Sequence, residues 1–191
     1  TGLIKIFKNA SNFYKKQQEI HGIANKRMIE AIRSNPNVIG YCVHALTAGD
    51  WIIGAGLLDI WRNPKGLAYD KTKEANRSKL AVLRTNKRNY FEGEKVIISR
   101  IMINENKSDI NNVKLSVHNQ KDLIFNDDLE IKLNNGITEL EKIDLGTDLS
   151  AGEYKVKISL ITDNTVNYTT SINFNIFSID NSTKRGSVAI I

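Results

Sequence analysis

The stretch VNYTTSINFNIF, residues 166–177, alternates large apolar side chains with short polar ones. Successive side chains of a β-strand point to opposite faces, so this period of two predicts a strand with one buried and one solvated face. The expected buried set is Val166, Tyr168, Ile172, Phe174 and Ile176. The intervening Asn, Thr and Ser side chains are expected to face water. The stretch therefore predicts a second half of the chain made of strands that are buried on one side.

Working back from this stretch, the same alternation recurs between turn signals and gives seven strand candidates. Their number and spacing are typical of an immunoglobulin-like β-sandwich. The motif LSAGEY at 149–154 has the form of a tyrosine corner, in which the hydroxyl of Tyr154 returns to nearby backbone. The candidates are Leu80–Arg84, Lys95–Asn104, Val113–His118, Leu123–Leu133, Ile137–Leu145, Tyr154–Thr162 and Val166–Phe177.

The first half has a different pattern, that of helices flanking one buried strand. Ser11 is a candidate N-cap for a long helix with an apolar stripe at helical spacing, which Asn35 and Pro36 end near Ser34. Residues Val38–Leu46 are apolar on both faces, which predicts a strand buried in a parallel sheet. A loop over 47–65 and a second helix over Gly66–Asn76 follow. This order, helix, buried strand, loop and helix, is typical of an α/β repeat.

The switch in periodicity predicts a domain boundary. We expect an α+β chain in which residues 1–77 form the last helix-strand-helix unit of a (β/α)8 barrel, residues 78–180 form the sandwich, and residues 181–191 form a tail or linker. In such barrels the loops after the strands carry the active site, so residues 47–62 are the segment of interest. The opening residues lack a start Met and a signal peptide pattern, so we expect the chain to be a piece of a longer protein.

Composition excludes several classes of function. No apolar run approaches the roughly 20 residues that a membrane span needs. The 27 basic residues are interspersed with 21 acidic ones, so the net charge of +6 indicates a solvated surface and no nucleic-acid partner. The one cysteine, Cys42, excludes an internal disulfide and is expected to be buried. No His/Cys/Asp cluster with zinc spacing and no phosphate-binding glycine loop occurs, so no metal and no cofactor is predicted.

Residues 37–65, NVIGYCVHALTAGDWIIGAGLLDIWRNPK, resemble the end of the catalytic barrel in glycoside hydrolase family 2. The shared parts are a Gly-Tyr strand, a Leu-Thr pair, a Gly-Leu-Leu-Asp turn and an Arg-x-Pro-Lys helix start. They stand here at Gly40-Tyr41, Leu46-Thr47, Gly56–Asp59 and Arg62–Lys65. The family also continues into a sandwich, which matches Leu80 onward, including YFEGE at 90–94.

The resemblance implies that the chain is the C-terminal piece of a retaining glycosidase that acts on β-linked sugars. Retention needs two carboxylates roughly 5 Å apart, and the family carries these glutamates on earlier barrel strands. The catalytic residues would therefore lie upstream, the partner of the parent enzyme would be a carbohydrate substrate, and the isolated chain would be inactive.

The same resemblance implies three substrate-binding residues, namely His44, Asp50 and Trp51. His44 could instead be a packing histidine, and Asp50 and Trp51 could pack the loop against the barrel. Family members carry an acidic residue where this chain has Ala48, which leaves open whether Asp50 takes that place. Trp61, Arg62 and Lys65 are expected to be structural closure elements.

Two further expectations concern partners. The alternative to a glycosidase piece is a non-catalytic sandwich that binds carbohydrate or protein, for which Tyr90, Phe91 and Phe125 are the few candidate platform aromatics. A barrel strand without neighbours leaves open edges and apolar surface. We therefore expect the chain either to self-associate through Val38–Leu46 or to rearrange residues 1–77 away from barrel geometry.

Overall fold

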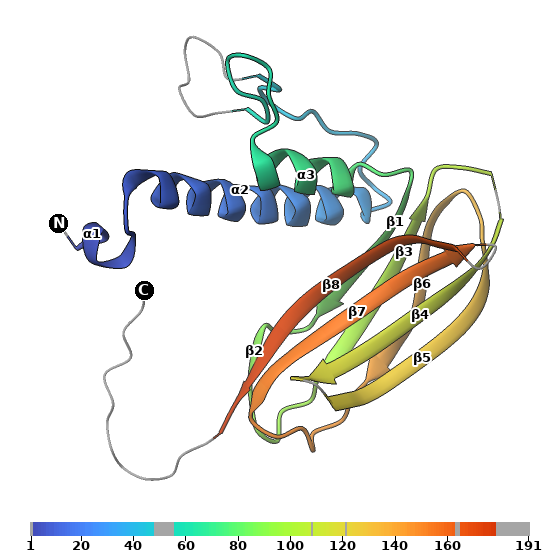
Figure 1. The fold of residues 1–191 in the computed structure, drawn as a ribbon. Helices are drawn as coiled ribbons and strands as arrows, with labels where there is room; N and C mark the ends of the chain where they lie inside the picture. The colour runs from blue at the N-terminus through green and yellow to red at the C-terminus, as the bar shows by residue number, and fades with distance from the viewer. Residues whose placement is uncertain (1, 48–55, 108, 121, 163–164, 179–191) are drawn as a thin grey trace. The chain divides into compact units, whose positions relative to one another are not determined.

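The computed structural model describes residues 2–47, 56–107, 109–120, 122–162 and 165–178. Within these described residues, three helices precede eight strands (Figure 1). The helices are α1 (Leu3–Ile6), α2 (Ala10–Arg33) and α3 (Gly66–Ala75). The strands are β1 (Lys79–Thr85), β2 (Asn89–Phe91), β3 (Ile97–Asn104), β4 (Asp109–Asn119), β5 (Asp122–Leu133), β6 (Gly136–Asp144), β7 (Gly152–Thr162) and β8 (Thr165–Phe177).

The chain divides into two compact units. The first comprises Thr1–Val82, Met102–Lys107 and Asn134–Ile137, and the second comprises Leu83–Ile101, Ser108–Leu133 and Thr138–Ile191. The helical unit thus includes short segments from the strand half of the sequence. The domain bounds expected from the sequence, 1–77 and 78–180, stay a prediction.

Both predicted long helices are present, but the N-cap prediction was wrong. Asn9, not Ser11, caps α2, because its backbone is extended and its side-chain oxygen accepts a hydrogen bond from the Asn12 N–H at 2.9 Å. At the other end, the Ser34 N–H donates to the Glu30 carbonyl oxygen. None of the described helices is long and apolar enough to cross a membrane.

Helices α2 and α3 approach each other closely at Gly22. A Cβ atom at this position would lie 2.3 Å from the Leu67 carbonyl oxygen, so only glycine fits. Two small side chains of α3, Ala68 and Ala75, are fully buried. The backbones can come this close only because neither helix presents a bulky side chain at the contact.

Charged groups fix the same pair of helices. The Lys26 ammonium of α2 lies 2.5 Å from Glu74 of α3, and Lys71 lies 2.7 Å from the same carboxylate. Arg33 donates to the Ala75 carbonyl oxygen at the end of α3 and pairs with Glu105 at 2.8 Å. The Arg33 side chain is nearly buried, so these charge-assisted bonds also satisfy a group that would be costly to bury alone.

The predicted buried strand over Val38–Leu46 was wrong. These residues form no strand, and Val38, Ile39 and Leu46 are exposed. Cys42, predicted to be buried, is exposed too. A strand that is apolar on both faces needs a hydrogen-bonded neighbour on each side. No described segment runs beside this one as a strand, so its apolar side chains stay in water.

The strand half forms a three-stranded sheet, β1-β3-β6, and a five-stranded sheet, β2-β8-β7-β4-β5 (Figure 1). All seven predicted strands are present. The missed strand, β2, is three residues long, too short to show alternation, and pairs parallel with β8. In the second unit Arg100 of β3 binds Asp127 of β5 and the Glu141 carbonyl oxygen of β6, which ties the two sheets together.

The core of the sandwich follows the predicted alternation. Tyr168, Phe174 and Ile176 of β8 are buried, whereas Val166 is exposed at the strand end, beyond a register shift in the β7–β8 ladder. The predicted tyrosine corner is confirmed: the Tyr154 hydroxyl donates to the Ser150 carbonyl oxygen at 2.8 Å, and its ring stacks on Phe174. Tyr90, a candidate platform aromatic, is instead buried.

We predict that Gly22→Ala destabilises the helical unit. Alanine in place of glycine inside a helix gains about 1 kcal/mol of propensity. Forcing α3 away from the new methyl group costs about 1–3 kcal/mol. Because the obstacle is the Leu67 backbone, the second effect should win. Urea denaturation followed by the helical circular dichroism signal measures the difference.

Gly40→Ala is the matched control, because a Cβ there meets nothing within 4 Å. Its effect should stay within about 0.5 kcal/mol. A Gly22→Ala chain as stable as the parent would show that the close contact of α2 and α3 is not present in solution.

Candidate functional site

Residues 57–65 form a tight hairpin that leads into α3. The Lys65 N–H donates to the Leu57 carbonyl oxygen at 2.9 Å, and Leu58 forms an antiparallel bridge with Pro64. The other side of the hairpin is anchored, because the Leu57 and Leu58 N–H groups both donate to the Leu46 carbonyl oxygen. The chain therefore turns back on itself between residues 58 and 64.

Asp59 closes the turn. Its carboxylate accepts hydrogen bonds from the Trp61 N–H at 2.9 Å, from the Asn63 N–H at 2.8 Å and from the Asn63 side-chain amide at 3.1 Å. Its backbone donates to the Asn63 carbonyl oxygen and accepts from the Arg62 N–H. Aspartate suits this place because its short side chain reaches backbone groups two residues ahead.

These bonds perturb the Asp59 carboxyl group. Partial desolvation raises its pKa, but the hydrogen bonds from Asn63 and Trp61 and the nearby charge of Lys65 outweigh that effect, so the pKa lies below its usual value. Asp59 is therefore ionised at neutral pH and serves as an acceptor within the turn.

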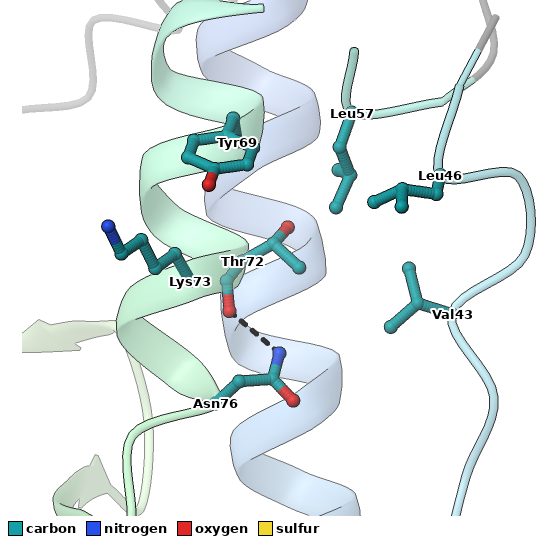
Figure 2. Close-up of a pocket in the computed structure, with 7 residues that line it drawn as sticks. All are labelled: Val43, Leu46, Leu57, Tyr69, Thr72, Lys73 and Asn76. Carbon is teal, nitrogen blue, oxygen red and sulfur yellow. Dashed lines mark hydrogen bonds between the residues drawn. The ribbon is translucent and has the colours of Figure 1, made fainter. Parts of the chain in front are cut away.

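An apolar pocket of about 360 Å³ lies between Val43, Leu46 and Leu57 on one side and α3 on the other. Figure 2 shows Val43, Leu46 and Leu57 opposite Tyr69, Thr72, Lys73 and Asn76. Two polar side chains of the α3 wall, Thr72 and Asn76, are already hydrogen-bonded. Thr72 donates to the Ala68 carbonyl oxygen, and Asn76 donates to the Thr72 carbonyl oxygen (Figure 2) and accepts from the Tyr41 hydroxyl. No carboxylate is among these seven lining residues, so the pocket is suited to packing rather than to acid-base chemistry.

Glu74, behind this wall, is held as an ion-pair partner. Burial raises the pKa of the Glu74 carboxyl group, but the hydrogen bonds and charges of Lys26 and Lys71 lower it by more than burial raises it. The net pKa lies below the usual value, so the group stays ionised at neutral pH. In the part of the chain that the structure describes, no three His, Cys, Asp or Glu side chains are grouped to hold a metal ion.

The three predicted substrate-binding residues are not brought together among the described residues. His44 is exposed next to Val43 and does not line the pocket. Asp50 and Trp51 lie outside the described residues. Trp61 and Arg62, expected to be closure elements, are both exposed at the tip of the turn, and the Trp61 side chain is 75% exposed. The Asp59–Asn63 turn signature could have indicated this exposed tip from the sequence.

Among the comparisons with known proteins, only the search of solved structures found matches. No protein-family model and no curated protein matches the chain. Among solved structures, the chain is similar to a β-D-mannosidase from Dictyoglomus thermophilum, with a TM-score of 0.64 and 17% identity over 83% of this chain. The chain has the fold of part of that enzyme. It spans 19% of the enzyme's length.

Two further structures overlap about half of the chain. One is a β-glucuronidase from Parabacteroides merdae, with a TM-score of 0.37 and 17% identity, which covers 50% of this chain and 13% of that one. The other is a glycosyl hydrolase family 2 member from Bacteroides cellulosilyticus, with a TM-score of 0.39 and 14% identity, which covers 50% of this chain and 14% of that one. Scores this low do not establish a common fold. The match to the mannosidase agrees, at the level of the fold, with the resemblance of the chain to glycoside hydrolase family 2, a family that includes β-mannosidases.

We predict that Asp59→Ala loosens the turn. Removal of the carboxylate leaves the Trp61 and Asn63 N–H groups without their acceptor, so both amides should exchange faster with deuterated water in NMR-detected hydrogen exchange. Asp70→Ala is the control, because the exposed Asp70 carboxylate has no hydrogen bond or ion pair to another described residue.

Acid should have the same effect as the substitution. The pKa of Asp59 is lower in the folded chain than in the unfolded chain. The stabilisation of the turn by the ionised carboxylate is therefore complete above the unfolded pKa of about 3.9, and it is lost as the pH falls through the lower folded pKa. Trp61 amide protection that is the same in Asp59→Ala as in the parent would contradict this account of the turn.

Proposed function

We propose that the chain is the C-terminal part of a retaining β-glycosidase, in which residues 1–77 complete a (β/α)8 barrel and the sandwich is an accessory domain. The supporting observation is the extent of the match to the mannosidase. Residues 78–180 are just over half of the chain, so a match over 83% also includes part of the helical segment. One enzyme thus has counterparts of both parts.

Exposed apolar side chains support a covering partner for the helical segment. Eleven of the nineteen large exposed apolar side chains of the described residues lie on α1, α2, the 38–46 segment and α3. Surfaces of this kind mark interaction sites. The eleven are Ile6, Tyr14, Ile20, Ile23, Met28, Val38, Ile39, Tyr41, Val43, Leu46 and Leu67.

Helix α2 shows the pattern most clearly, because it has two apolar faces. The face with Gly22 and Ile29 is buried. Ile20, Ala24 and Met28, spaced four residues apart, share another face and are exposed. A helix inside a barrel packs against both its neighbours and the strands. The second face of α2 is where further barrel would pack.

The arrangement of the described acidic side chains in the 2–77 segment supports the proposal that the catalytic glutamates lie upstream. Glu19, Glu30 and Glu74 form ion pairs on the helices, and Asp59 is occupied within its turn. Asp70 is the one described carboxylate here without such a partner, and a retaining mechanism needs two roughly 5 Å apart. We assign the acid/base and the nucleophile to further chain, and His44, Asp50 and Trp51 to substrate binding.

The rival function, a sugar-binding sandwich, has weaker support. Phe91 and Phe177 are both half exposed and adjacent at the edge of the five-stranded sheet. Their rings are tilted by 57° to each other, however, so they do not form one flat platform on which a sugar could lie.

The test is expression of the whole gene product beside the 191-residue chain. The longer protein should hydrolyse a nitrophenyl β-mannoside, β-galactoside or β-glucuronide, with retained anomeric configuration in the first product seen by NMR. The isolated chain should give no turnover. Inversion, or turnover by the isolated chain that is lost on mutating one of its own glutamates, would contradict the proposal.

A further inference from the structure

Trp61 is the most exposed aromatic side chain among the described residues, at 75%. It stands at the tip of the 59–63 turn, beside Ile60, which is also exposed. A large apolar ring in water costs free energy unless a ligand covers it.

The support under Trp61 is rigid. Its own N–H group donates to the Asp59 carboxylate, and the N–H groups of the next two residues, Arg62 and Asn63, also donate to Asp59. A ring on a pre-ordered turn loses little conformational freedom when it binds, so more of the contact energy appears as affinity.

Arg62 adds a second recognition group at the same tip. Its φ angle of 68° lies in the left-handed region, which residues with a side chain seldom adopt. Such backbone outliers cluster at ligand-binding sites. The exposed Arg62 guanidinium has no carboxylate partner among the described residues, so its donors are available.

We propose that Trp61 and Arg62 form a sugar-binding subsite. The indole face would stack on the C–H face of a β-linked pyranose, and the guanidinium would donate hydrogen bonds to ring hydroxyls. The inference rests on the proposed function, because in the proposed barrel this turn, which precedes α3, would belong to one of the loops that carry binding residues.

A hydroxyl-bearing ligand fits this tip better than a protein partner does. Protein hot spots are surrounded by contacts that exclude water. Here the residues that flank Ile60 and Trp61 in the 59–63 turn, Asp59, Arg62 and Asn63, are all polar. Polar groups around one flat apolar ring suit a sugar, which has one apolar face and a rim of hydroxyls.

The test follows the two tryptophan indole N–H signals of the ¹⁵N-labelled chain, which Trp61→Phe assigns. Methyl β-D-mannopyranoside and β-1,4-mannobiose are the probes. The Trp61 signal should shift saturably, with a Kd on the order of 1–10 mM, as typical ligand efficiencies give for a monosaccharide. Trp61→Ala should abolish binding, and Asp59→Ala should weaken it while the indole remains. Tyr14→Ala, which removes another exposed ring, should leave binding unchanged.

Three outcomes would overturn the subsite. The first is no shift of the Trp61 signal at sugar concentrations up to about 100 mM. The others are binding that survives Trp61→Ala, and a Trp61 shift that depends only on protein concentration. The last would assign the tip to a protein contact. These readouts differ from turnover by the longer gene product. If the longer protein is an active glycosidase but the Trp61 signal does not shift with either sugar, only the subsite is contradicted. If the longer protein is inactive but Trp61 binds sugar, only the proposed catalysis is contradicted.

Discussion

The contact of α2 with α3 at Gly22 is the constraint on which the rest of the helical unit depends. With a Cβ position 2.3 Å from the Leu67 carbonyl oxygen, the two backbones touch without an intervening side chain. Lys26 and Glu74 then lie within ion-pair distance across the helices, and Arg33 reaches the end of α3. The pocket wall and the hairpin that enters α3 take their positions from this pairing.

A second constraint explains what the unit lacks. A strand that is apolar on both faces needs neighbouring strands for its backbone and packing partners for the side chains of each face. Helices alone cover one face at most. Val38–Leu46 therefore has no stable place as a strand within the described chain, and the exposed second face of α2 shows the same deficit. Both are what a segment of a larger barrel would present, which is how the proposed function accounts for them.

Local patterns in the sequence predicted the elements that depend on local or same-domain contacts. Alternation located seven strands, and the Tyr154 corner formed because its hydroxyl and its acceptor are four residues apart. Prediction failed where the outcome depends on distant neighbours. The apolar pattern of Val38–Leu46 is typical of a buried strand, but a strand forms only where neighbouring strands are present to pair with it. Ser11 lost the capping position to Asn9 through backbone geometry that sequence does not display.

The candidate site was predictable only in part. The Gly56–Lys65 motif covers the turn that carries Trp61, but the exposure of Trp61 depends on three hydrogen bonds to Asp59 that form only when the turn is folded. Of the three residues named for substrate binding, His44 alone falls among the described residues, and it is exposed away from the pocket lining.

The central claim is that the apolar surface of the helical segment is a docking face for further chain. Sedimentation velocity of the 191-residue chain over a range of concentrations tests it most directly. The account predicts concentration-dependent self-association that Ile20→Lys with Met28→Lys weakens, whereas Leu123→Lys, at an equally exposed position in β5, has no effect. A chain that stays monomeric at every concentration would contradict it.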